Sequence, residues 1–109
     1  MGKVKCKSYT LRDENGWLGQ VVLTSDGMFA SVTDWGNFAF AWRSYGEDFR
    51  DFIISINVDY FEGKMINGMA YFAMNRKIDA AAQRFAKKIL PPLQKMLKEE
   101  IEAGINPFD

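Results

Sequence analysis

Hydrophobic and polar residues alternate with a period of two through the first forty or so positions, the pattern of strands that bury one face. This alternation predicts strands at residues 4–11, 17–24, 28–33 and 38–43. Turn signals separate them at Asn15-Gly16, Asp26-Gly27 and Trp35-Gly36, and dipeptides of this kind favour tight hairpins. We therefore expect a four-stranded antiparallel meander.

After Ser44 the spacing of hydrophobic residues changes to a period of 3.6, which is that of an α-helix. The spacing Ser44-x-x-Glu47 is that of a capping box, which predicts a helix beginning there. A helix of about ten residues is expected to follow, with one buried stripe formed by Phe49, Phe52, Ile53 and Ile56. The sheet is thus expected to pass directly into helices.

Two further helices are predicted. Asn57 is expected to cap a short helix that ends at Asn67-Gly68, with inward residues Val58, Phe61, Met65 and Ile66. The segment 69–74 fits either a buried connection or a fifth strand. Asn75 is then expected to cap a long helix running to Gly104, with apolar positions at Ile78, Ala82, Phe85, Ile89, Leu93, Met96, Leu97 and Ile101. Pro91 and Pro92 predict a kink or break near residues 89–90.

These elements predict one α+β domain over residues 1–109, because the chain is long enough for one core only. Phe38, Phe40 and Trp42 share one face of the fourth strand, and Ala39 and Ala41 share the other. An aromatic row of this kind is more often core than a platform for stacking bases. The sequence pattern alone does not indicate whether the helices cover the aromatic face or the alanine face of this strand.

Composition excludes several chemistries. The chain has no histidine and one cysteine, Cys6, so imidazole catalysis, ordinary zinc sites and an internal disulfide are not available. The acids match no regular metal-ligand spacing. We expect a non-enzymatic protein without a metal or cofactor. The lack of an apolar span or leader predicts a soluble chain in a reducing cytoplasm, with no membrane partner.

The net charge of zero conceals a separation along the chain. Residues 13–62 hold nine acids and two bases, whereas residues 76–98 hold seven bases and one acid. Such a distribution orients a small protein on a charged partner. We therefore weigh two binding surfaces against the plainer interpretation that both regions are ordinary solvated surface.

The first surface is acidic and predicts protein binding. Asp34, Asp48, Asp51 and Asp59 would face a basic partner, and Trp35 in its turn would serve as an interface anchor. The alternative is DNA or RNA binding through a helical stripe at Lys77, Arg84, Lys88 and Lys95. A third possibility is a homodimer joined through Met96, Leu97 and Ile101 of the C-terminal helix.

One stretch also carries a resemblance. The run Asp34-Trp35-Gly36-Asn37, the aromatic strand ending in Trp42-Arg43, and Gly46-Glu47-Asp48-Phe49 before an apolar helix resemble small proteins of tailed bacteriophages and prophages. The resemblance covers residues 24–62, and Trp35 stands where tyrosine is more usual.

The resemblance implies a phage accessory factor in the cytoplasm of a bacterial host and carries no catalytic residue. By analogy of context, it favours stoichiometric binding of a host or phage protein. A protein of bacterial defence or of nucleic-acid handling is one such target.

Overall fold

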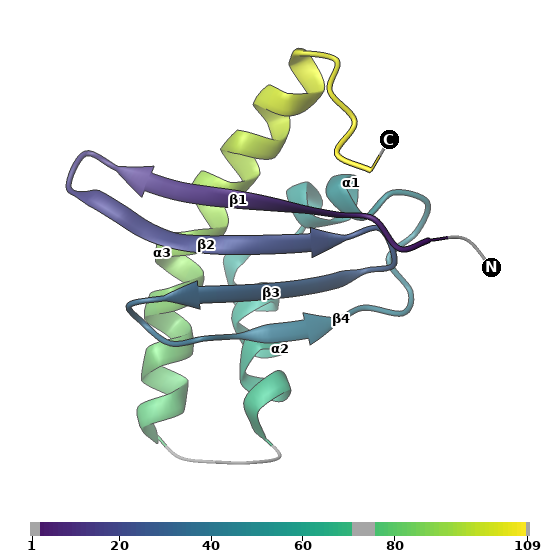
Figure 1. The fold of residues 1–109 in the computed structure, drawn as a ribbon. Coiled ribbons are helices and arrows are strands. Elements are labelled where there is room, and N and C mark those ends of the chain that lie inside the picture. The colour runs from purple at the N-terminus through teal and green to yellow at the C-terminus, as the bar shows by residue number, and fades with distance from the viewer. Residues whose placement is uncertain (1–2, 71–75, 109) are drawn as a thin grey trace.

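The structure is a computed structural model that describes residues 3–70 and 76–108, without the side chains of residues 69, 70 and 76–78. A sheet of four strands lies against three helices (Figure 1). The elements are β1 (Cys6–Asp13), β2 (Gly16–Thr24), β3 (Met28–Thr33), β4 (Ala39–Ala41), α1 (Phe49–Ser55), α2 (Val58–Ala70) and α3 (Arg76–Glu102). The predicted α+β class is confirmed.

The sheet is the predicted antiparallel meander, with strand order β1-β2-β3-β4. β3 has the predicted bounds, β1 begins and ends two residues later than expected, and β4 keeps only the centre of its predicted span. Gly27 and Gly36 take φ values of +98° and +126° in the turns, a region that favours glycine. The turn signals therefore specified the hairpins correctly.

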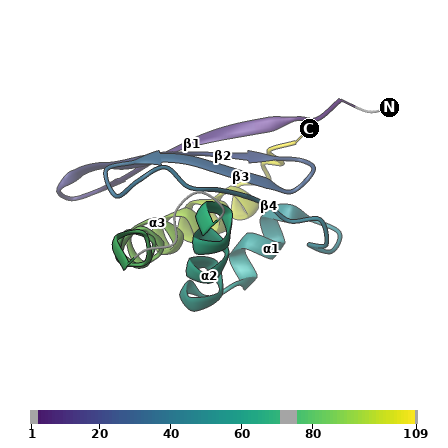
Figure 2. The same cartoon turned by 90° about the horizontal axis from the view of Figure 1, so that it is seen from below.

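All three helices cover one face of the sheet (Figure 2). Alternation along the strands places Tyr9, Val21, Leu23 and Phe29 on this face, and all four are buried. Phe38 and Trp42 are buried on the same side, with Phe40 half-buried, whereas Ala39 and Ala41 are exposed. The helices thus pack on the aromatic side, and the interpretation of the row as core is confirmed.

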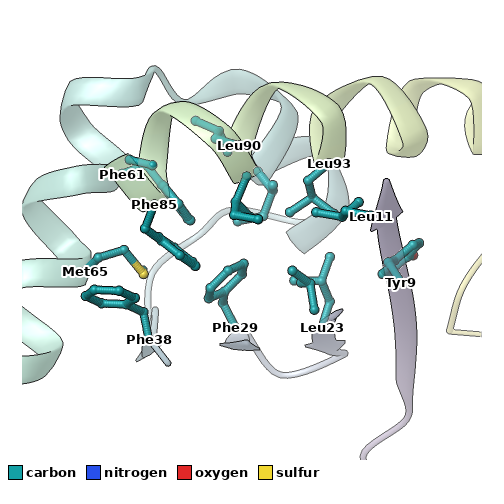
Figure 3. Close-up of a cluster of buried hydrophobic side chains, with 14 of the residues drawn as sticks. Tyr9, Leu11, Leu23, Phe29, Phe38, Phe61, Met65, Phe85, Leu90 and Leu93 are labelled. Carbon is teal, nitrogen blue, oxygen red and sulfur yellow. The ribbon is translucent and has the colours of Figure 1, made fainter. Parts of the chain in front are cut away.

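The core is organised around aromatic rings from the sheet and the helices (Figure 3). The centroid of the Phe29 ring lies 5.2 Å from that of Phe61 on α2 and 6.1 Å from that of Phe85 on α3, both edge-to-face. The Phe38 and Phe85 centroids are 4.5 Å apart. Edge-to-face pairs add to the stability that burial gives, so these rings fix the helices on the sheet.

The first helix does not begin at the predicted capping box. Gly46 has φ +90°, which is incompatible with a helical turn and separates Ser44 from the helix. Asp48 is the N-cap instead, and its carboxylate accepts a hydrogen bond of 3.1 Å from the Asp51 amide. The prediction of a box at Ser44 and Glu47 is therefore wrong, although the buried residues Phe49 and Ile53 are as expected.

The second helix begins as predicted but continues further. The Asn57 side chain accepts a hydrogen bond of 2.7 Å from the Tyr60 amide, and the helix runs past Asn67-Gly68 to Ala70. A side chain at Gly68 would collide with the carbonyl oxygen of Ala39. Gly68 therefore permits close packing of α2 on β4 and does not end the helix. Residues 71–75, including the expected cap Asn75 and most of the undecided segment 69–74, lie outside the described residues.

Of the predicted kink or break near Pro91 and Pro92, the break is wrong, because the long helix α3 continues through both residues. A proline inside a helix costs about 3 kcal/mol. Four fully buried side chains flank the pair, however, at Ile89, Leu90, Leu93 and Leu97, and each contributes roughly 1.5–3 kcal/mol. Packing on the sheet therefore outweighs the lost hydrogen bonds. The helix ends as predicted at Gly104, where the Gly104 and Ile105 amides donate to the carbonyls of Ile101 and Glu100.

The same packing corrects the expected dimer surface on α3. Leu97 is fully buried in the core of its own chain, and only Met96 and Ile101 of the predicted trio are exposed. The helix therefore does not present the three residues as one apolar face.

Candidate functional site

The candidate site is built around the start of α1. The loop before this helix is held by Tyr45, whose hydroxyl donates a hydrogen bond of 3.1 Å to the Ser25 carbonyl. The Tyr45 ring lies edge-to-face on Phe49, with centroids 5.2 Å apart. Phe49 is buried in the core, so the loop and the first turn of α1 are fixed to the β2–β3 end of the sheet.

A hollow of about 740 Å³ opens beside this first turn. It is lined by three carboxylates, two aromatic rings and one hydroxyl, from Glu47, Asp48, Asp51, Tyr45, Phe52 and Ser55. Asp51 and Glu47 are exposed, and Asp48 and the two rings are partly buried. The hollow therefore joins negative charge to aromatic side chains, a combination that suits a lysine or arginine side chain.

The carboxylates surround the hollow and do not converge on one point. Within the described part of the chain, no group of three or more histidine, cysteine, aspartate or glutamate side chains comes together to hold a metal ion. The arrangement fits a broad basic surface better than a single cation.

Arg50 is the base of α1, and it lies on the other side of the helix. Its guanidinium donates a hydrogen bond of 3.0 Å to Glu100 on α3 and another of 2.6 Å to the Ile105 carbonyl. The Glu100 carboxylate also accepts bonds from Lys7 Nζ at 2.6 Å and from the Tyr9 hydroxyl at 3.1 Å. We call Lys7, Tyr9, Arg50 and Glu100 the Glu100 cluster. It ties α1 to β1 and to the end of α3.

In the Glu100 cluster, the cost of burying the Glu100 charge is offset by the hydrogen bonds that this carboxylate accepts. Burial raises the pKa of the Glu100 carboxyl, but the hydrogen bonds from Lys7, Arg50 and Tyr9 outweigh this effect and hold the pKa below its ordinary value. Burial and the adjacent Glu100 carboxylate raise the pKa of the Tyr9 hydroxyl. Glu100 is therefore ionised and Tyr9 neutral at physiological pH.

Because Arg50 is held by Glu100, it does not neutralise the hollow. Both ion pairs among the described residues end on Glu100, from Lys7 and from Arg50. Within that part of the chain, Glu47, Asp48 and Asp51 make no ion pair. The negative charge of the hollow is thus available to a partner.

The predicted acidic residues do not all gather at this site. Asp48 and Asp51 line the hollow, while Asp59 is exposed in the first turn of α2 and does not line it. Asp34 and Trp35 lie in the β3–β4 turn, at the opposite end of the sheet from α1 (Figure 1). Trp35 is partly buried against the core. The structure therefore divides the set between two ends of the molecule.

The predicted basic stripe lies on the outer side of α3. Arg84, Lys88 and Lys95 are exposed, as are Lys87 and Lys98, and among the described residues none of the five takes part in an ion pair. The side chain of Lys77 is not described. The bases lie opposite the buried side of the helix, where an amphipathic helix is ordinarily solvated.

Comparison with known proteins bears on the origin of the chain. The model of one phage family matches residues 1–77. The chain belongs to this phage family. The match includes the segment 24–62 that resembles tailed-phage proteins, and the expected phage origin is confirmed. No curated protein and no solved structure matches the chain.

Among the described residues, no helix has the length and apolar character needed to cross a membrane.

The sequence did not reveal the Glu100 cluster or the aromatic lining of the hollow. One signal for the cluster was present, since Glu100 follows Leu93 and Leu97 on the buried stripe of α3, and a charge on such a stripe requires a partner. Its partners Lys7 and Arg50 are distant in sequence, at separations of 93 and 50 residues. Only the fold brings them together.

Proposed function

We propose that this phage-family protein is a non-enzymatic accessory protein that binds a basic surface of a host or phage protein through the acidic hollow. The observation that carries the proposal is the unneutralised charge of Glu47, Asp48 and Asp51 beside the rings of Tyr45 and Phe52. The neighbouring base Arg50 is bound on the far side of α1. A partner's lysine or arginine would supply the missing counter-charge.

The partner class that we favour is a protein with a basic groove for nucleic acid, including a protein of bacterial defence. Such a groove already binds phosphates, and carboxylates on a rigid scaffold present similar negative charge. Opposite potentials speed encounter and fix orientation, and like charges exclude other partners. Inhibition would then follow from occupation of the groove, with one copy of this chain per groove.

Affinity capture from infected cells with a hollow variant and a matched control tests the proposal. The hollow variant is Glu47→Gln with Asp51→Asn, and the control is Glu14→Gln with Asp34→Asn. Each removes two exposed carboxylates, so the net charge changes equally. Quantitative mass spectrometry, with nuclease added, measures the recovered proteins.

We expect wild type and control to recover the same basic protein in the presence of nuclease, and the hollow variant to lose it by at least tenfold. Purified partner and chain should then form a complex of defined stoichiometry. Equal recovery by all three proteins would show that the hollow is not the binding site.

One observation favours nucleic-acid binding as a second candidate function. Arg84, Lys87, Lys88, Lys95 and Lys98 lie on the exposed side of α3 with no ion pair in the described residues. From residue 84 to residue 98 the helix rises about 21 Å, long enough to follow several phosphates.

Fluorescence anisotropy of labelled single- and double-stranded DNA distinguishes this candidate from the first. Phosphate binding predicts a rise in anisotropy at low salt, a steep loss of affinity as salt increases, and a weaker complex for Lys88→Gln with Lys95→Gln. Unchanged anisotropy at low salt would exclude this candidate for these DNAs and leave the hollow as the proposed site.

A further inference from the structure

Within the residues that the structure describes, the sheet has a second face that no helix covers. β1 to β4 lie above all three helices in Figure 2, and the side away from the helices faces solvent. Strand pairing fixes which residues stand there, because partners across a ladder point to the same side. Ser8 pairs with Val22, Val22 with Ala30, and Ala30 with Ala39. The outward side chains therefore form continuous rows across the four strands.

These rows contain one charged residue, Arg12, which stands at the margin of the sheet. We call this surface the open face; it consists of Cys6, Ser8, Thr10, Arg12, Trp17, Gln20, Val22, Thr24, Met28, Ala30, Val32, Ala39 and Ala41. Charged residues make up 26% of the whole chain, so thirteen positions would ordinarily include three or four. Met28 and Val32 are 42% and 57% exposed. The outer face of a solvated antiparallel sheet is normally polar, which makes this face unusual.

The size of the open face defines what it can bind. Strands of 8, 9, 6 and 3 residues, with a rise of about 3.4 Å and a spacing of about 4.8 Å, give an area of roughly 420 Å². A stable interface buries about 800 Å² on each partner. The open face therefore matches a weak, reversible contact better than a permanent one.

The charge distribution favours a second copy of the same chain over an unlike partner. A two-fold axis places the same surface on both sides of the contact, and a surface whose one charge stands at its margin meets itself with little repulsion. One end of the sheet holds Asp13, Glu14 and Asp34 beside Arg12, a net negative charge, and the opposite end holds Lys5 and Arg43 beside Asp26, a net positive charge. A two-fold axis across the strands, in the plane of the contact, would bring these unlike charges together at both margins.

We propose that the open face is a self-association surface, on which two copies stack sheet against sheet as a reversible homodimer. Sheets packed in this way lie about 10 Å apart, and the small side chains Ala30, Ala39 and Ala41 permit that approach. The contact is independent of the acidic hollow, whose residues lie on α1 and in the loop before it. Each copy in the dimer would keep its hollow accessible.

Sedimentation velocity of the full chain from micromolar to millimolar concentration tests this inference. We expect a monomer–dimer equilibrium with a dissociation constant on the order of 100 µM. Met28→Glu should weaken it by at least tenfold, since each copy would then bury an unpaired carboxylate in the contact. Val32→Glu should act in the same direction.

Met96→Glu is the matched control, because Met96 on α3 is 37% exposed and Met28 on the open face 42%. It should leave the equilibrium unchanged, as should Glu47→Gln with Asp51→Asn in the hollow. Circular dichroism confirms that each variant is folded. A strict monomer at millimolar concentration would overturn the inference. A dimer disrupted by Met96→Glu, but not by Met28→Glu and Val32→Glu, would place the contact on α3 and would also overturn it.

Discussion

The two sides of α1 use the same residue types for different purposes. On one side Glu100 is buried and accepts hydrogen bonds from Lys7, Tyr9 and Arg50. On the other side the acids of the hollow are accessible to solvent, and within the described residues they make no ion pair. A carboxylate that the fold supplies with donors stabilises the fold, whereas one without a cationic partner remains available for binding.

Arg50 separates these two roles. It belongs to the same helix as Asp51 but lies on the side of Glu100, where its guanidinium also binds the Ile105 carbonyl. If Arg50 turned toward the hollow, it would neutralise part of the charge and leave Glu100 with fewer donors. The Glu100 cluster therefore keeps the hollow acidic as well as holding α1 in place.

The largest expected effect is loss of stability when the Glu100 cluster is broken. Glu100→Ala removes the buried acceptor and leaves Arg50, whose side chain is 11% exposed, without its counter-charge. Breaking a buried pair in this way costs about 3 kcal/mol. Urea unfolding followed by circular dichroism measures the loss.

Glu99→Ala is the control because Glu99 is the exposed neighbour on α3. The free energy of unfolding of this variant should differ from that of wild type by less than about 0.5 kcal/mol. Equal losses of stability for Glu100→Ala and Glu99→Ala would contradict the stabilising role of the Glu100 cluster.

The second prediction concerns pH. Since hydrogen bonding lowers the pKa of Glu100 in the folded state, the unfolded chain binds this proton at a higher pH than the folded chain does. The stabilisation is therefore fully present above the unfolded pKa and is lost as pH falls through the folded value. Unfolding titrations between pH 7 and pH 3 should show a smaller decrease for Glu100→Gln than for wild type. Parallel curves would indicate that Glu100 has an ordinary pKa.

A smaller effect is expected at the cap of α1. Asp48→Ala removes the side chain that accepts from the Asp51 amide and should lower the free energy of unfolding by about 1 kcal/mol. Asp48→Asn keeps an acceptor and removes one charge from the hollow, so it should be nearly neutral for stability while weakening a basic partner. A strongly destabilising Asp48→Asn would show that its charge serves the fold.

The smallest effect on stability is expected in the hollow itself. Glu47→Gln with Asp51→Asn changes two exposed side chains and should alter the free energy of unfolding by less than about 0.5 kcal/mol. Relief of mutual repulsion and loss of the favourable interaction between Asp51 and the N-terminus of α1 oppose each other. Thermal unfolding of this variant and of Glu100→Ala, each compared with wild type, measures the two losses of stability side by side. A loss near that of Glu100→Ala would mean that both sides of α1 are structural.

Local patterns in the sequence predicted most of the fold. Alternation and the turn residues at 15–16, 26–27 and 35–36 gave the meander, and β3 has the expected bounds. The spacing of Phe61 and Met65, and of Phe85 and Ile89, gave the buried sides of α2 and α3. These features depend on residues that are close in sequence, so one amino-acid sequence is enough to predict them.

The errors arose where tertiary structure overrides a local rule. The capping-box spacing at Ser44 ignores Gly46, which takes a positive φ between the two ends of the box. Pro91 and Pro92 predicted a kink or a break, and the break is wrong because four buried side chains hold α3 on the sheet. Gly68 was predicted to end its helix because glycine is common at helix ends, but it lies inside α2 and permits close packing against Ala39.

The candidate site was only partly predictable for the same reason. Asp48 and Asp51 were found because they are acids near a helix start. Their separation from Asp34 and Trp35, and the diversion of Arg50 to Glu100, depend on contacts between distant segments. The open face was missed because its rows, with Arg12 as their one charge, appear only when four strands are placed in register.

The most direct test of the acidic hollow is a nuclear magnetic resonance titration of the ¹⁵N-labelled full chain with a short oligolysine peptide. We expect amide shifts to concentrate at Tyr45, Glu47, Asp48, Asp51, Phe52 and Ser55, to diminish as salt is added, and to be lost in Glu47→Gln with Asp51→Asn. Shifts centred on the β3–β4 turn at Asp34, or spread evenly over all the acids, would contradict binding at the hollow.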